Sequence, residues 1–364
     1  MRRLFAGMAA ALLAAVLFFP EDVAAISAKS AIVLDSTTGR VLFEKQPDQQ
    51  MLIASTTKIM TALIVCEQCN VLDRVRVPRE AVGIEGSSMY LREGEVLTVQ
   101  ELLYGLMLHS GNDAAVALAV YCAGTVEGFA QLMNDKAHQL GMDSTHFINP
   151  NGLDAPGHFS TARDMAVLAA YAMDNPIFAQ TVATKTVTVA GRTLRNHNKL
   201  LWQIEGADGV KTGYTKAAGR ILISSATRQG RRLIAVTMSD PNDWQDHKQL
   251  LEQGFENFTA CKVIEAGQCL GTVELAGAQA SHVNLIAAED FSYAVTENET
   301  IITVLPGPGF VYAPVTEGQC AGYVNIMLDN KMIGKVALVY GQTVEREADP
   351  KVPFWKRLLG GGEQ

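Results

Sequence analysis

The chain has 364 residues, which is enough for about two globular domains. Hydrophobic residues make up 48% of it and charged residues 19%, so extensive disorder is excluded and a sizeable core can form. With 38 acidic and 30 basic residues the net charge is −8 at pH 7, which argues against a nucleic-acid partner, because such proteins need a basic face toward the phosphates.

The first residues have the pattern of a secretory signal peptide. Arginines at positions 2 and 3 precede an apolar run over residues 4–19, and small residues close the segment at Ala25. The run is too short to span a membrane comfortably. We therefore expect residues 1–25 to be removed on export, with an uncleaved membrane anchor as the alternative.

Cysteines are sparse for an exported chain of this length, and they lie at Cys66, Cys69, Cys122, Cys261, Cys269 and Cys320. Cys66 and Cys69 form a C-x-x-C pair, but no second such pair or paired-histidine motif accompanies it. We expect buried free thiols rather than bridges, and neither a metal site nor another cofactor.

Up to about residue 258, strand-like and helix-like patterns follow one another. β-rich runs at residues 31–35 and 41–44 flank a glycine-containing turn and predict a hairpin. Apolar residues at helical spacing predict helices at residues 56–66, 99–108, 112–123, 126–140 and 164–173. Strands are then predicted at 186–189, 210–213, 221–227 and 233–238, followed by a helix over 246–258. This order predicts an α+β domain over residues 28–258, with an antiparallel sheet, helices packed on it and a helical cluster.

The helical period is lost after residue 261. Short β-like runs alternate with turn residues, at 269–275, 282–287, 301–304, 323–328 and 335–340. They predict an all-β domain over residues 261–345, with a mechanical or adhesive role, because it holds no cluster of nucleophile, base and acid. In the tail, residues 346–364, apolar side chains at helical spacing lie among positive charges and predict either a short amphipathic foot on a membrane or a frayed end.

Ser55 and Lys58 lie where an extended segment gives way to a predicted helix. Ser55 suits an N-cap, but Lys58 places a positive charge in the first turn, where the helix dipole disfavours it. At positions i and i+3 both side chains share one helix face, so the amine can reach the hydroxyl. The helix end and any neighbouring cation lower the pKa of such a lysine, which favours its action as a neutral base.

Two further motifs follow in the chain. Ser110 and Asn112, joined by a glycine, lie between two predicted helices, where a hydroxyl and an amide can relay a proton and hold a carbonyl. Lys211 and Thr212 on a predicted strand can bind a carboxylate, and Gly213 lets a ligand approach the backbone. Each motif alone is unspecific, whereas the three in this order point strongly to one chemistry.

The set resembles that of the low-molecular-mass penicillin-binding proteins, specifically the serine-type D-alanyl-D-alanine carboxypeptidases with Ser-Gly-Asn as middle motif. Residues 149–158, 160–164 and 208–213 are similar to that family's signature loop, helix start and third-motif strand, and the β-rich remainder looks like its C-terminal domain. The resemblance implies a β-lactamase/transpeptidase-like catalytic domain, no cofactor, and a location in a bacterial cell wall or at the outer face of the cytoplasmic membrane. It also implies that the protein removes the terminal D-Ala from peptidoglycan stem pentapeptides and is inhibited covalently by β-lactams.

The resemblance also implies roles for the motif residues. Ser55 would attack the penultimate D-Ala carbonyl, Lys58 would take its proton, and Ser110 with Lys211 would pass that proton to the leaving amine. Asn112 would hold the substrate amide, and Thr212 with Lys211 would bind the terminal carboxylate. Next to Gly213, the backbone N–H of Tyr214 would form an oxyanion hole with that of Ser55, worth about 3 kcal/mol per donor.

One stretch departs from the family pattern. Some relatives have an arginine shortly after the strand that ends near Met238, whereas residues 239–244 here contain none. Two other functions stay open: a D,D-endopeptidase acting on crosslinks, and a non-catalytic wall-binding or β-lactam-sensing module, although a pure binder has no need of Ser55 and Lys58. A β-lactamase is disfavoured, because no glutamate can be assigned to rapid deacylation.

Overall fold

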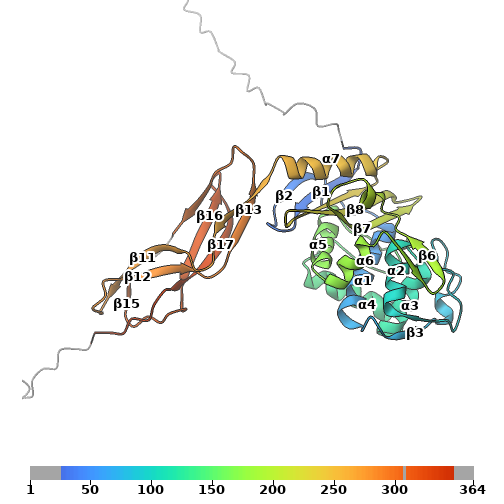
Figure 1. Ribbon diagram of the computed structural model, residues 1–364, viewed down its shortest axis with the longest axis horizontal. Helices are drawn as coiled ribbons and strands as arrows, with labels where there is room; N and C mark the ends of the chain where they lie inside the picture. The colour runs from blue at the N-terminus through green and yellow to red at the C-terminus, as the bar shows by residue number, and fades with distance from the viewer. Residues whose placement is uncertain (1–25, 306–308, 348–364) are drawn as a thin grey trace, which may run out of the picture.

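The computed structural model describes residues 26–305 and 309–347. The predicted signal peptide lies outside the described residues, as does the tail from residue 348. Figure 1 shows an α+β domain and an elongated all-β domain side by side, joined after α7 (Asp243–Glu256). The predicted fold class is therefore confirmed.

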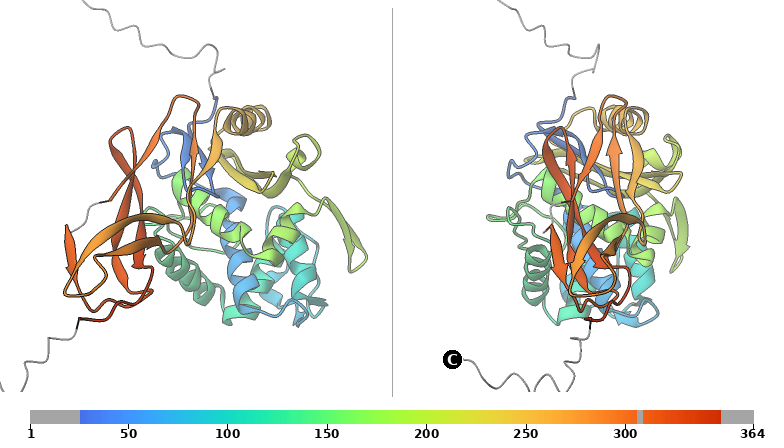
Figure 2. Two further views of the ribbon diagram at one scale, coloured as in Figure 1. Left: turned by 60° about the vertical axis from the view of Figure 1, so that its left-hand side comes forward. Right: turned by 90° about the vertical axis from the view of Figure 1, so that its left-hand side faces the viewer.

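The α+β domain is built on one antiparallel sheet in the order β2-β1-β9-β8-β7. Its strands are β1 (Ser30–Asp35), β2 (Val41–Lys45), β7 (Ala207–Thr215), β8 (Gly219–Arg228) and β9 (Arg231–Met238). Helix α7 covers one face, and α5 (Ala162–Met173) and α6 (Pro176–Ala183) cover the other (Figures 1 and 2). Because both faces are covered, β8 and β9 contain runs of buried residues rather than a strict alternation.

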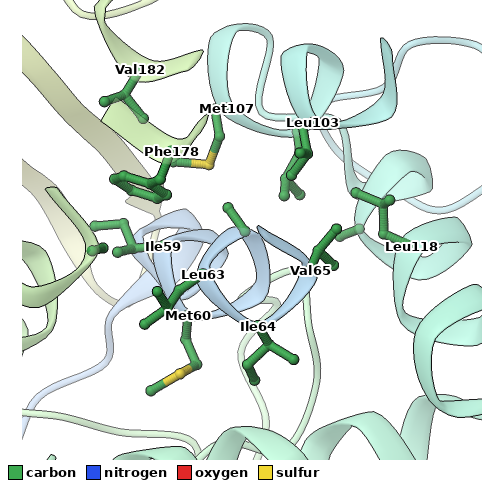
Figure 3. Close-up of a cluster of buried hydrophobic side chains, with 14 of the residues drawn as sticks. Ile59, Met60, Leu63, Ile64, Val65, Leu103, Met107, Leu118, Phe178 and Val182 are labelled. Atoms are coloured by element: carbon green, nitrogen blue, oxygen red, sulfur yellow. The ribbon is translucent and has the colours of Figure 1, made fainter. Parts of the chain in front are cut away.

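Helix α1 (Lys58–Gln68) runs through the centre of the helical cluster, between α2 (Val99–Leu108), α3 (Asn112–Ala123), α4 (Val126–Gln139), α5 and α6. In Figure 3 its side chains Ile59 and Leu63 lie among those of α2 and α6, including Met107 and Phe178. Each fully buried side chain of this size contributes about 1.5–3 kcal/mol. Every residue from Lys58 to Cys66 is buried, so this packing fixes the helix that carries Lys58.

Some elements differ from the sequence prediction. The first helix begins at Lys58 rather than residue 56, because a 3-10 turn, η1 (Ala54–Thr57), precedes it. The last helix begins three residues before the predicted residue 246. Helix α6 was not predicted; its eight residues are too few for a clear helical period, although Asn175 caps it and Pro176 opens it. Short strands also escaped prediction, namely β3 (Arg74–Arg76), β4 (Val96–Thr98) and β6 (Arg192–Arg195), the partner of β5 (Thr186–Val189).

The C-terminal domain contains only strands among its described residues. A six-stranded sheet has the order β14-β16-β17-β12-β11-β15, and β10 pairs with β13 beside it. The strands are β10 (Thr259–Ile264), β11 (Cys269–Ala276), β12 (His282–Ala287), β13 (Phe291–Val295), β14 (Ile301–Val304), β15 (Phe310–Tyr312), β16 (Cys320–Leu328) and β17 (Lys331–Tyr340). The prediction of an all-β domain is therefore confirmed, although β10, β13 and β15 were not among the predicted strands.

The six cysteines are all free, as expected. The expectation that they are buried holds for Cys66, but Cys69 and Cys122 are half-buried and the other three are exposed on the β-domain. No single described helix is long and apolar enough to cross a membrane; α3 and α4 meet the length and composition criteria only as a pair bent by 84°.

Candidate active site

The nucleophile candidate lies in the tight turn that leads into α1. Ala54, the first residue of the 3-10 turn η1, has a left-handed φ of +45°, and this turn presents Ser55 at the surface of a cleft. One turn later, the Lys58 side chain is fully buried, and its Nζ donates to Ser55 Oγ at 2.9 Å. The i, i+3 spacing therefore brings the amine to the hydroxyl, as the sequence indicated.

Two more acceptors surround the Lys58 amine. Nζ also donates to Asn112 Oδ1 at 2.7 Å and to the backbone oxygen of Asn151. Burial, and secondly the positive charge of Lys211, hold the pKa of Lys58 well below its ordinary value. An amine in this setting readily exists in its neutral form.

The loop over residues 149–158 is pressed against the nucleophile turn. Gly152 has a φ of +84°, and a Cβ at this position would lie 1.9 Å from the backbone oxygen of Ala54. Asn149 Oδ1 accepts from the N–H of Gly152 at 2.7 Å, which holds the loop in shape. This close approach brings the Asn151 carbonyl to Lys58. The sequence identified the loop through its resemblance, but not this contact.

The second motif forms the connection between α2 and α3. Ser110 adopts a left-handed φ of +62° between the two helices, and Asn112 is the first residue of α3. The Asn112 side chain donates through Nδ2 to Glu85 O at 2.6 Å, which orients its oxygen toward Lys58. Asp113 then accepts from the backbone N–H of Met89 at 3.0 Å and so ties the loop after Glu85 to α3.

The third motif lies on β7, as predicted. Gly213 packs closely on η1: a Cβ there would lie 3.3 Å from the backbone nitrogen of Thr56. The neighbouring Lys211 is buried, its Nζ donates to the backbone oxygen of Thr212 at 2.9 Å, and burial lowers its pKa to about 7. Burial, with the charge of Lys211 adding to it, also lowers the pKa of His197 to about 4. Strand β7 thus places the titratable amine of Lys211 next to the cleft.

A cleft of about 310 Å³ collects these elements. Of the eight residues singled out in the sequence, Ser55, Ser110, Thr212, Gly213 and Tyr214 line it. Lys58 and Asn112 are hydrogen-bonded directly behind it, and Lys211 is buried beneath Thr212. The lining also includes residues that sequence reasoning missed, namely Ser87, His197, Arg220, Asp243 and Trp244. They lie outside the three motifs and have no motif of their own. A larger neighbouring cavity of about 720 Å³ shares His197 but holds none of the motif residues.

Comparison with known proteins identifies the family. Residues 18–242 match the family model described as D-alanyl-D-alanine carboxypeptidase, and residues 258–346 match that of the penicillin-binding protein 5 C-terminal domain. The D-alanyl-D-alanine carboxypeptidase DacF of Bacillus subtilis is 30% identical over 349 residues, which span 92% of this chain and 89% of that protein. DacC of Escherichia coli is 35% identical over 340 residues, spanning 88% and 85%.

The crystal structure of penicillin-binding protein 5 from Haemophilus influenzae is similar over most of this chain. It superposes with a TM-score of 0.79 at 32% identity, covering 88% of this chain and 98% of that one. The likeness includes both domains, since the aligned part is longer than either domain alone. The chain therefore belongs to the D-alanyl-D-alanine carboxypeptidase family of low-molecular-mass penicillin-binding proteins.

Proposed function

We propose that the protein is a serine D-alanyl-D-alanine carboxypeptidase in which Ser55 is the nucleophile and Lys58 the general base. One observation carries the assignment: Ser55 Oγ lies 2.9 Å from the amine of a fully buried lysine. The other two acceptors, Asn112 Oδ1 and Asn151 O, account for both hydrogens of a neutral amine. The remaining lone pair then points at the Ser55 hydroxyl, as proton abstraction requires.

The reaction follows from this arrangement. Ser55 Oγ bonds to the carbonyl carbon of the penultimate D-Ala while its proton passes to Lys58. The tetrahedral oxyanion accepts hydrogen bonds from the backbone N–H groups of Ser55 and Tyr214, worth about 3 kcal/mol each. Proton return through Ser110 and Lys211 to the leaving nitrogen expels the terminal D-Ala and leaves an ester on Ser55. Water then attacks the ester, restoring the free hydroxyl and releasing the shortened peptide.

Substrate binding is assigned to the walls of the cleft. Asn112 would bind the substrate amide, and Thr212 with Lys211 would bind the terminal carboxylate next to Gly213. β-Lactams would acylate the same serine, since their strained amide occupies the place of the scissile bond. Exported protein cleaved after Ala25 would act on peptidoglycan stem peptides during wall maturation, with residues 346–364 making a peripheral membrane contact.

The assignment is tested by acylation and by turnover. After incubation with benzylpenicillin, mass spectrometry of a proteolytic digest should locate the adduct on the peptide that contains Ser55, and Ser55→Ala should carry none. Wild-type protein should release free D-Ala from diacetyl-L-Lys-D-Ala-D-Ala. An adduct on another residue, or a folded wild type that is neither acylated nor active, contradicts the mechanism. Separation of crosslinked muropeptides into two stem peptides, without release of free D-Ala, would instead identify an endopeptidase.

A further inference from the structure

An arginine that belongs to none of the three motifs lies on the wall of the cleft. Arg220 lies at the start of β8 and pairs in register with Tyr214 of β7. Tyr214 is two residues after Thr212 on the same strand. Cross-strand partners in an antiparallel pair present their side chains to the same face of the sheet. Arg220 therefore lines the cleft beside the strand that is expected to bind the substrate carboxylate, and 43% of its side chain is exposed there.

The guanidinium of Arg220 contacts two neighbouring residues at the start of α7. Arg220 Nη2 donates to both carboxylate oxygens of Asp243, at 2.7 and 2.8 Å, and its Cζ lies 5.8 Å from the centre of the Trp244 ring. Asp243 is itself buried in the first turn of α7, where the helix N-terminus stabilises a negative charge. Within the part of the chain that the structure describes, Arg220 Nε and Nη1 donate no hydrogen bond, so these two donors are free for a ligand.

Arg228, at the other end of the same strand, shows the contrast. It also connects β8 to α7, through Nη1 and Nη2 to Glu252 at 2.8 and 2.7 Å, and its Nε donates to Glu205 O at 3.1 Å. All three of its nitrogens are thus bonded within the protein, and it does not line the cleft. The unused donors of Arg220 are a property of its place in the cleft rather than of the strand.

We propose that Arg220 binds the terminal carboxylate of the substrate, together with Thr212, and that Asp243 and Trp244 position it. This inference rests on the carboxypeptidase function proposed above. Residues 239–244, which contain no arginine, thus provide the carboxylate and the aromatic ring that hold an arginine of the neighbouring strand in the cleft. A hydrogen bond from a guanidinium to a carboxylate is charge-assisted, which favours a free acid over an uncharged group at this position.

The test compares two substrates that differ only in the negative charge of the C-terminal carboxylate. One is diacetyl-L-Lys-D-Ala-D-Ala, and the other is the same peptide with a C-terminal amide; kcat/KM is measured for each. For Arg220→Gln we expect kcat/KM on the acid to fall about 10- to 100-fold, the effect of one or two charge-assisted hydrogen bonds. On the amide the same variant should change by less than about threefold. Arg220→Lys, which keeps the charge but not the planar fork, should lose less on the acid than Arg220→Gln.

Two further variants separate binding from structure. Asp243→Asn should also lower kcat/KM mainly for the acid substrate, because Arg220 stays in place but loses the carboxylate that orients its guanidinium. The matched control Arg228→Gln should leave the ratio of the two kcat/KM values unchanged. Equal losses on acid and amide for Arg220→Gln would mean a structural role, and an unchanged acid rate would mean no contact with the carboxylate; either result overturns the inference.

Failure of the proposed function has a different signature. If folded wild type cleaves neither peptide, carboxypeptidase activity is refuted while Arg220 is still tested by acylation. The rates with benzylpenicillin and with its methyl ester are then compared. A wild-type preference for the acid that Arg220→Gln reduces about 10-fold or more supports the assignment. The assignment of Arg220 is overturned if Arg220→Gln keeps the wild-type preference for the acid, or if the wild type has no such preference.

Discussion

At the scale of single residues, the Lys58 amine has three hydrogen-bond acceptors, and all of them are uncharged: a hydroxyl, an amide oxygen and a backbone carbonyl. A buried ammonium without a directly bonded counter-charge is costly, whereas the neutral amine is satisfied by two acceptors and its own lone pair. The pKa of Lys58 lies well below its ordinary value for this reason, first through burial and then through Lys211. The neutral amine of Lys58 is thus favoured, and it can accept the proton of Ser55.

Replacement of Lys58 by arginine tests the base directly. Lys58→Arg keeps a positive charge, but a guanidinium does not lose its proton in this pH range. We expect acylation by benzylpenicillin to slow by at least about 10²-fold, within the range typical of general-base assistance. The melting temperature reports whether the larger group is tolerated, and Lys58→Met provides a neutral comparison. Near-normal acylation in Lys58→Arg would show that the lysine only balances charge.

The second amine predicts a pH effect with a definite sign. The charge of Lys211 lowers the pKa of Lys58, and this effect operates where Lys211 is protonated, below its own pKa of about 7. In Lys211→Gln the pKa of Lys58 should rise, so the acid limb of the pH–acylation profile moves to higher pH, on top of a general loss of rate. Benzylpenicillin acylation measured between about pH 5 and about pH 9 gives both the midpoint of the acid limb and the maximal rate. A midpoint that stays in place or moves to lower pH would contradict the coupling.

At the scale of elements, the predictable parts of the site are those with a local pattern. Helical spacing indicated α1 and hence the approach of Lys58 to Ser55, and β-rich composition indicated the strand that carries Lys211. The turn η1 was not predictable, because its four residues are too few for a helical period. The contact of Gly152 with Ala54 was not predictable, because it joins segments about a hundred residues apart. Arg220 was missed for another reason: it belongs to no motif, and only the pairing of β7 with β8 places it opposite Tyr214.

The Gly152 contact leads to a prediction about the loop. A methyl group at Gly152 would lie 1.9 Å from Ala54 O, so Gly152→Ala must displace the loop or the nucleophile turn. We expect a loss of several kcal/mol of stability, and acylation at least about 10-fold slower, because Asn151 O moves away from Lys58. Gly141→Ala is the matched control: its φ is +71°, but a Cβ there meets nothing within 4 Å. It should cost only the left-handed strain of about 1–2 kcal/mol and leave acylation unchanged. Similar acylation rates in both variants would show that the loop does not orient the base.

At the scale of the whole molecule, the two domains meet at the edge of the sheet opposite to β7 (Figure 2). Arg40, between β1 and β2, donates to both carboxylate oxygens of Glu299 at 2.6 Å and to Ala294 O. The hydrogen bonds from Arg40 lower the pKa of Glu299 to about 2. A carboxylate with a lowered pKa stabilises the contact above its ordinary pKa of 4.5 and loses this contribution as pH falls toward about 2. The domain contact should therefore persist at neutral pH.

Every residue that lines the cleft precedes residue 245, and the β-domain adjoins the far edge of the sheet, so removal of that domain should leave the chemistry intact. A chain ending at Phe258 keeps α7 and the bond from Arg231 to Phe258 O. We expect its kcat/KM on the small peptide to stay within about threefold of the full chain, because no catalytic contact is lost. Its sedimentation with isolated sacculi or anionic vesicles should decrease, and a chain ending at Glu347 tells whether the tail or the β-domain is responsible. Loss of small-peptide turnover in a truncated protein that still melts cooperatively would show that the β-domain shapes the cleft after all.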